Sequence, residues 1–187
     1  MYADTKVKYP VSWSSNGKLL LYMASADPQG ADLWVLPLAS EQSGAGLKPQ
    51  SFRKSSSYGQ FSPDGKWVAY ESDESKPAEI YVVPFSRPSE KHQISTNGGV
   101  KPRWRRDGKE IFYMTPSGQL MAAEVRISGE TVEVGAIRVL FGGIEFSNGY
   151  FYDVSADGQR ILTVLPANRT SPTPITLIQN WPAALKR

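Results

Sequence analysis

Short apolar runs, broken at regular intervals by turn residues, make up most of this chain. Four stretches repeat one order of an apolar residue, a tight turn and an alternating apolar run: WSSNGKLLLYMAS from Trp13, FSPDGKWVAYESD from Phe61, WRRDGKEIFYMTP from Trp104 and VSADGQRILTVLP from Val154. Their turn glycines, Gly17, Gly65, Gly108 and Gly158, lie 43 to 50 residues apart. Runs of this kind are typical of β-strands, and helical periodicity is nearly absent. The pattern therefore predicts a repeated, all-β chain.

Further apolar runs follow each turn. The second runs are DLWVLPL from Asp32, EIYVVPF from Glu79, QLMAAEV from Gln119 and ITLIQNW from Ile175, and the third are KPQSFRKS from Lys48, KHQIST from Lys91 and IRVLFG from Ile137. Four short antiparallel strands in a repeat of this length are typical of one β-propeller blade, which must stack on its neighbours. We predict a single all-β propeller domain over residues 1–187, built from four four-stranded blades at about 9–56, 57–99, 100–149 and 150–187.

Four blades leave three arrangements open. The chain is part of a larger propeller, a compact four-bladed ring, or half of a ring that a homodimer closes. Because the fourth repeat lacks a run for its last strand, residues 2–8 are expected to supply it as a closing strand.

Aromatic residues recur at two positions of the repeat. Trp13, Phe61 and Trp104 share the first position with Val154, and Tyr22, Tyr70 and Tyr113 share the second with Thr163. We expect these two columns to pack between blades rather than to form a ligand cage.

The Asp-Gly turn itself could have been a phosphate or metal loop. Pro63 presets the backbone angle of the turn, Asp64 bonds nearby backbone, and Gly65 takes the positive φ that closes it. A phosphate loop would need the pattern Gly-x-x-x-x-Gly-Lys-Ser/Thr between a strand and a helix. A calcium loop would need more oxygen ligands than the one Asp of each turn. The turn is therefore interpreted as the corner between two strands.

These motifs resemble the WD40-like, or TolB-type, β-propeller repeat, whose signature is an aromatic-Ser-Pro-Asp-Gly-Lys turn and a later Asp/Glu-aliphatic-Trp/Tyr-Val strand. The resemblance covers nearly the whole chain and departs from the consensus at Asn16 and Val154. It implies the C-terminal propeller of bacterial multidomain proteins, some with a Ser/Thr kinase and others with a DNA-binding regulator domain. By resemblance alone, a bacterial periplasmic or other extracytoplasmic location is expected rather than a cytoplasmic one.

The amino-acid composition excludes several kinds of chemistry. The 187 residues carry a net charge of +3 and no cysteine, which excludes thiol chemistry and disulfides. The one basic cluster, Arg103, Arg105, Arg106 and Lys109, surrounds a turn and is interpreted as solvated rather than as an anion-binding patch, so no nucleic-acid partner is expected. No run is long enough to span a membrane, and LLLYMASA at residues 19–26 matches a strand better than an export signal.

Catalytic constellations are sparse in the sequence. His92 is the only histidine, and it lies in a run expected to form an outer strand, away from a central pocket. Zinc and iron sites are not expected, and no cofactor is predicted. A calcium-dependent propeller lactonase would draw on Asn148 and Asp153, and a substrate-gating propeller of a larger serine peptidase would need a separate hydrolase domain.

The prediction is a non-catalytic binding module that recognises a protein, a peptide or a small ligand at the mouth of the channel. Propellers bind on loops that lead into the first strands of their blades. The candidate residues on these loops are Tyr58, Gln60, Lys101, Arg103, Asn148, Tyr150, Tyr152 and Asp153. Because Arg103 and Asp153 occupy equivalent positions of adjacent repeats, they are alternatively an ion pair.

Overall fold

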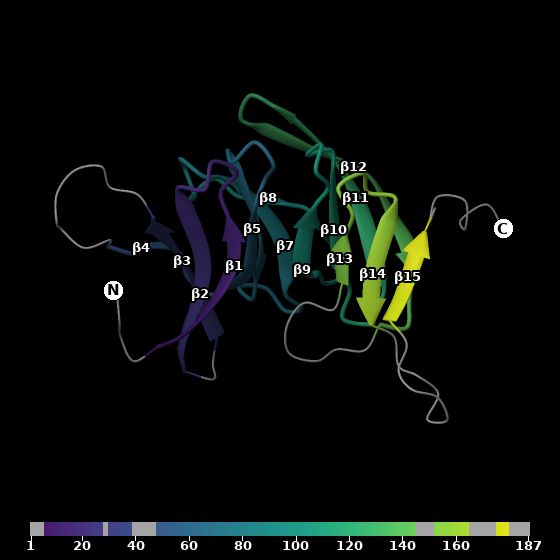
Figure 1. Cartoon of the computed structure of the whole chain (residues 1–187), viewed down its shortest axis with the longest axis horizontal. Coiled ribbons are helices and arrows are strands. Elements are labelled where there is room, and N and C mark those ends of the chain that lie inside the picture. Colours follow the sequence, from purple (N-terminus) through teal and green to yellow (C-terminus); the bar gives the residue numbers. More distant parts are fainter. Residues whose placement is uncertain (1–5, 28–29, 39–47, 145–151, 165–174, 180–187) are drawn as a thin grey trace. The chain divides into compact units, whose positions relative to one another are not determined.

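The fold is all β and is built from four antiparallel sheets in chain order (Figure 1). The computed structural model describes residues 6–27, 30–38, 48–144, 152–164 and 175–179, and no helix occurs among them. Contacts between Cα atoms divide the chain into two compact units, Met1–Pro102 and Arg103–Arg187. Each unit is described separately below.

The first unit contains two four-stranded meanders, in which consecutive strands pair. The first sheet consists of β1 (Val7–Trp13), β2 (Leu19–Asp27), β3 (Gly30–Pro37) and β4 (Gln50–Arg53). The second consists of β5 (Ser56–Phe61), β6 (Trp67–Ser72), β7 (Glu79–Pro84) and β8 (His92–Gln93). His92 thus lies in an edge strand, as predicted, with its ring 6.0 Å from that of Trp67.

The other two sheets follow the same order. The third consists of β9 (Val100–Trp104), β10 (Glu110–Met114), β11 (Leu120–Ser128) and β12 (Thr131–Phe141), and the unit boundary falls within β9. The fourth has three described strands, β13 (Tyr152–Val154), β14 (Arg160–Val164) and β15 (Ile175–Gln179). Each sheet matches one predicted repeat.

The four predicted turns are confirmed as corners between paired strands. Their glycines all have left-handed backbones, with φ of 70°, 72°, 72° and 70° in chain order. In the second repeat the Gly65 N–H donates to the Ser62 carbonyl at 2.8 Å, and the Asp64 carboxylate accepts from the Ser62 hydroxyl at 2.6 Å. Local turn chemistry alone therefore accounts for this corner.

The two sheets of the first unit pack face to face. Leu21 and Leu33 of the first sheet share a buried cluster with Phe61 and Val68 of the second. An added Cβ at Gly59 would come within 2.6 Å of the Leu21 side chain, so only glycine permits this close approach of β5. Arg53 of β4 places its guanidinium carbon 5.1 Å from the centre of the Tyr70 ring, which is a cation–π contact between the two sheets.

The two aromatic columns have different outcomes. In the second column Tyr22, Tyr70, Tyr113 and Thr163 are all buried. In the first column Phe61 and Trp104 are buried, but the prediction for Trp13 is wrong because its side chain is 61% exposed. Trp13 lies in the edge strand β1, where no sheet of the first unit covers its outer side.

The expected closing strand also needs correction. The predicted closing strand includes Val7 and Lys8, but these residues pair with Ser25 and Ala24 of β2 inside the first sheet. Residues 2–5 lie outside the described residues. Among the described strands the fourth sheet has three, and β15 pairs with β14 alone.

Candidate functional site

Two residues with left-handed backbones mark the strands that begin the second and third repeats. Tyr58 in β5 has φ of 47° and Lys101 in β9 has φ of 56°. Each lies three residues before the buried aromatic of its repeat, Phe61 or Trp104. Non-glycine residues rarely adopt this conformation, and such strain concentrates at functional sites. In β5 it coincides with a bulge between Ser57 and Gln60.

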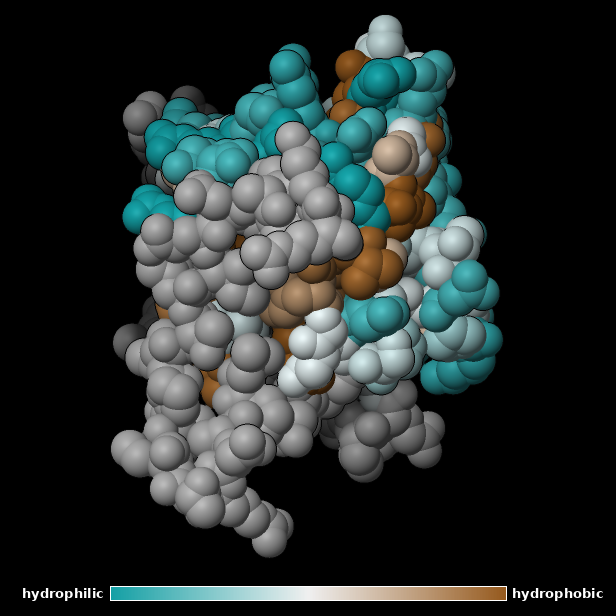
Figure 2. Space-filling view, turned by 90° about the vertical axis from the view of Figure 1, so that its right-hand side faces the viewer, coloured by the Kyte–Doolittle hydropathy of each residue, from teal (hydrophilic) through white to brown (hydrophobic). Residues whose placement is uncertain are grey.

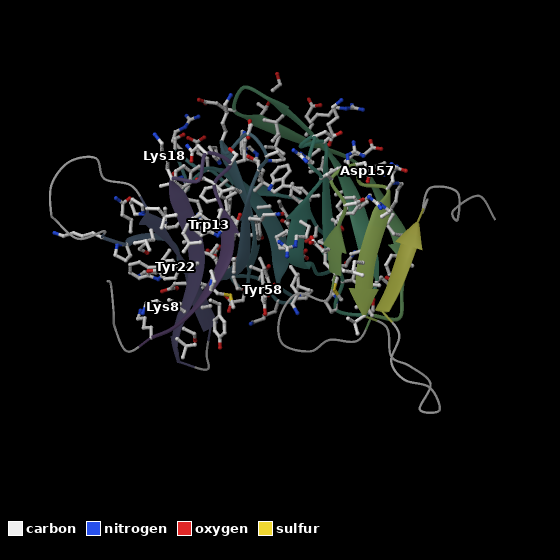
Figure 3. The ribbon with its side chains drawn as sticks, in the orientation of Figure 1. Lys8, Trp13, Lys18, Tyr22, Tyr58 and Asp157 are labelled. Atoms are coloured by element: carbon white, nitrogen blue, oxygen red, sulfur yellow. The ribbon has the colours of Figure 1, made fainter. Side chains whose placement is uncertain are left out.

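These two residues are in contact within the first unit. The Lys101 ammonium lies 5.1 Å from the centre of the Tyr58 ring. The Lys101 residue is only 5% exposed, so this cation–π contact is largely desolvated and strengthened. Figure 3 shows Tyr58 at the opposite end of the first unit from the turn that carries Lys18. The site therefore lies away from the Asp-Gly corners.

Glu71 completes the arrangement from β6. Its carboxylate accepts the Lys101 backbone N–H at 3.2 Å and a bond from the Ser57 side chain. Burial raises the pKa of Glu71 above its ordinary value, against the opposing effects of those bonds and of the Lys101 charge. Burial likewise lowers the pKa of Lys101, which the Glu71 charge partly offsets. Glu71 thus fixes the strained Lys101 backbone against Tyr58.

In the first two sheets, an acidic residue near the start of the third strand positions the chain that leads into the next sheet. Asp32 accepts the Ser55 backbone N–H at 3.1 Å after the first sheet. Glu79, at the equivalent place in the second, accepts the Gly98 N–H at 2.9 Å and bonds the Ser95 hydroxyl. These carboxylates hold the loops on which Tyr58 and Lys101 depend. Glu71 and the acidic pair were not among the predicted site residues, although Asp32 and Glu79 share one repeat position.

The predicted binding residues fall into separate groups. In the first unit Tyr58 and Lys101 meet, while Gln60 is half-buried and pairs with Ala69 in the β5–β6 ladder. In the second unit Arg103 and Asp153 form the alternative ion pair, with Nε 3.9 Å from Oδ1. Tyr152 is buried and pairs with Thr163, so its side chain does not face solvent. Asn148 and Tyr150 lie outside the described residues.

Two of the four residues of the basic cluster form ion pairs with acidic side chains. Arg105 bonds both Asp107, with Nε 2.7 Å from Oδ1, and the buried carboxylate of Glu110. The second paired residue of the cluster is Arg103, which lies against Asp153.

The described residues contain neither a grouped set of metal ligands nor a membrane-spanning helix. Over the described ranges, no three His, Asp or Glu side chains are grouped so that they could hold a metal ion. In the same part of the chain, no helix is long and apolar enough to cross a bilayer.

Comparisons with known proteins identify the fold. No family model matches the chain, and no curated protein matches it. Among solved structures, TolB from Acinetobacter baumannii is 16% identical with a TM-score of 0.52, covering 96% of this chain and 53% of that one. The β-propeller domain of the Trilobed protease from Pyrococcus furiosus is 14% identical with a TM-score of 0.56, covering 93% and 53%.

A candidate 6-phosphogluconolactonase from Bacteroides uniformis is also similar, at 13% identity and a TM-score of 0.51, covering 92% of this chain and 55% of that one. The chain therefore spans about half the length of these structures. At such low identity the likeness concerns the fold alone, and it confirms the predicted β-propeller architecture and the resemblance to TolB-type propellers.

Proposed function

We propose that this chain is a non-catalytic propeller module that binds a protein or peptide partner through the surface around Tyr58. The observation that carries the proposal is the contact between two strained residues of adjacent repeats, Tyr58 and Lys101. Backbone strain of this kind persists only when surrounding structure maintains it, here through Glu71. Tyrosine supplies a rigid, amphipathic contact surface at a binding site.

In this proposal Tyr58 contacts the partner, and Lys101 positions the Tyr58 ring. Lys101 is too buried to reach a partner itself, but its charge lies against the ring. A small ligand at the same surface and an extracytoplasmic location are further parts of the proposal, the second resting on the resemblance of the repeat.

The experiment is selection from a random-peptide phage library on the immobilised chain, followed by affinity measurement for the enriched peptides. Tyr58→Ala is expected to weaken their binding by at least about tenfold, which is a typical loss for a central aromatic contact. Lys18→Ala changes an exposed residue at the opposite end of the first unit and should leave affinity unchanged. Absence of enrichment, or peptides that bind Tyr58→Ala equally well, would contradict the proposal.

A calcium-dependent hydrolase is the alternative function, and the fold of the lactonase-like structure gives reason to test it. A required ion stabilises the folded state that binds it. Stabilisation by millimolar calcium above about 2 kcal/mol in a thermal titration would favour the enzyme. The binding module predicts no such shift.

A further inference from the structure

Two poorly solvated charges support the surface around Tyr58. Glu71 of β6 and Lys101 of β9 belong to the same unit, and Lys101 is only 5% exposed. Each charge opposes the effect of burial on the other: the Lys101 charge favours the ionised carboxylate, and the Glu71 charge favours the ammonium. Their interaction is stronger than it would be at an exposed site, because little water screens it.

The same pair determines the position of the Tyr58 ring. The Glu71 carboxylate accepts the Lys101 backbone N–H at 3.2 Å, and the Lys101 ammonium lies 5.1 Å from the centre of the ring. Tyr58 and Lys101 both have left-handed backbones, a conformation that persists only where surrounding structure maintains it. Loss of the Glu71 charge would therefore weaken the hold on the Lys101 backbone and on its side chain together.

Protonation removes that charge. A protonated carboxyl accepts weaker hydrogen bonds than a carboxylate, and it no longer offsets the charge of Lys101. In acid the ammonium cannot lose its own proton, so it regains solvation by leaving the ring for water. The Tyr58 ring then loses the contact that positions it. Burial raises the pKa of Glu71, so this change occurs at a higher pH than it would for an exposed glutamate.

The neighbours of Glu71 set the pH of this change. The groups that act on its carboxylate come from β5, β9 and the loop after β6: Ser57, Lys101 and Asp73. The first two favour the charged form, whereas the negative charge of the third raises the pKa of Glu71. From β7, uncharged Ile80 lies opposite Glu71, and Glu79 bonds the loop before β9 instead.

We propose that protonation of Glu71 switches the Tyr58 surface from a binding state to a non-binding state. The switch rests on the proposed function, because the switched surface is the one that binds the partner. Affinity is high above the pH at which Glu71 takes up a proton, and it falls as the pH drops through that value. By linkage, a bound partner makes protonation of Glu71 harder.

The affinity of peptides selected on the chain, measured between about pH 8 and about pH 4.5, tests the switch. Peptides without acidic residues or histidine are used, so that their own charge stays constant. Wild type is expected to lose at least about tenfold in affinity towards acid. Glu71→Gln resembles the protonated form, so it should bind weakly at every pH.

A double variant distinguishes the switch from simple damage to the site. Glu71→Gln combined with Lys101→Met removes both charges, and a thioether also packs well against an aromatic ring. This variant should recover affinity relative to Glu71→Gln alone and should show no pH dependence.

Two single variants test the assignment to Glu71. Asp73→Asn removes the negative charge that raises the pKa of Glu71, so the midpoint should move to lower pH. His92→Gln replaces the only histidine of the chain and should leave the midpoint unchanged. Far-UV circular dichroism over the same pH range verifies that each protein stays folded.

Exposed apolar side chains of the second unit provide the control for the place of binding. Leu162 and Val164 of β14 are 46% and 53% exposed. Figure 2, turned so that β14 and β15 face the viewer, shows apolar residues (brown) reaching the surface among polar ones. Leu162→Gln should leave affinity and its pH dependence unchanged. A loss of affinity in this variant would place the selected peptides on the second unit and contradict the proposed function.

NMR spectroscopy tests the switch without a peptide. The chemical shift of the Lys101 backbone amide should follow the protonation of Glu71, and Glu71→Gln should abolish this change. An amide that does not respond to pH in wild type, or that responds equally in Glu71→Gln, would overturn the switch.

The switch and the proposed function fail in different ways. If Tyr58→Ala weakens binding but wild-type affinity is constant with pH, the switch is wrong and the proposed function stands. If the amide responds as expected but Tyr58→Ala binds every peptide as well as wild type does, the proposed function is wrong and the protonation-driven change at Lys101 stands.

Discussion

The Asp-Gly turns of the second and third repeats have the same backbone but different side-chain chemistry. In both, the turn glycine donates to the carbonyl three residues back, at 2.8 Å for Gly65 and 2.9 Å for Gly108. In the second repeat the buried Ser62 hydroxyl accepts the Trp67 N–H at 3.0 Å and donates to Asp64. A single serine hydroxyl, bonded to the backbone and to the Asp64 carboxylate, therefore completes this corner.

In the third repeat Arg105 replaces that serine. Its guanidinium bonds Asp107, whose carboxylate also accepts the Lys109 N–H at 3.0 Å, as Asp64 accepts that of Lys66. Arg105 also bonds Glu110, and Arg138 of β12 bonds the same carboxylate. The same turn geometry can thus be completed by one small hydroxyl or by an ionic network that reaches the far edge of the sheet. The turn backbone therefore tolerates either set of side chains, but in the third repeat its stability depends on residues outside the turn, Glu110 and Arg138.

The largest expected effect comes from removing the centre of the network. Glu110→Ala should lower the free energy of unfolding by about 3 kcal/mol, because it leaves two arginines without their buried counter-charge. Urea denaturation measures the change. Glu124→Ala is the control: Glu124 contacts the same Arg138 at 3.6 Å but is much more exposed, so its loss should cost less than about 1 kcal/mol. Equal losses in the two variants would contradict a buried network.

The corner of the second repeat, which a serine hydroxyl completes, should lose less stability when its key side chain is removed. Ser62→Ala removes a buried hydroxyl and leaves the Trp67 N–H without that acceptor, which should cost about 1–2 kcal/mol. Ser155→Ala removes the equivalent hydroxyl at an exposed corner, where its partner, the Arg160 N–H, can bond water, and should cost less. A larger loss for Ser155→Ala than for Ser62→Ala in the same denaturation experiment would show that burial does not set the cost.

The smallest effect is expected from making the third corner like the second. Arg105→Ser should cost about 1 kcal/mol near neutral pH, because Arg138 still pairs with Glu110. The hydrogen bond from Arg105 holds the pKa of Asp107 below its ordinary value. A lowered acid pKa contributes stability that is present above the unfolded value of about 3.9 and is lost as pH falls through the folded pKa.

The stability difference between wild type and Arg105→Ser should therefore shrink below about pH 4. Denaturation curves at several acidic pH values measure it. The pKa of Asp157 is also lowered, by its bond from Ser155, but this effect is common to both proteins and cancels in the difference. A difference that stays constant down to the lowest pH at which both proteins fold would contradict the role of Asp107.

Much of this architecture could be predicted because it is local. The positive φ of Gly65, the alternating strand after it and the repeat spacing follow from residues within one repeat, so the four sheets match the predicted repeats. The Arg103–Asp153 ion pair could also be predicted, because the two residues occupy equivalent positions of adjacent repeats although they are distant in sequence. The burial of the three tyrosines in the second column was predictable for the same reason; Thr163, which interrupts that column in the sequence, is buried as well.

Tertiary structure alone decided the candidate site and the fate of Trp13. The contact of Tyr58 with Lys101 joins two repeats, and the left-handed backbone of Lys101 is bonded by Glu71, which is distant in sequence. Trp13 and Phe61 have the same repeat position and similar apolar character, yet one is exposed and the other buried. The position of a residue within its strand determines which face of the sheet its side chain occupies. Its burial depends on whether another sheet packs against that face.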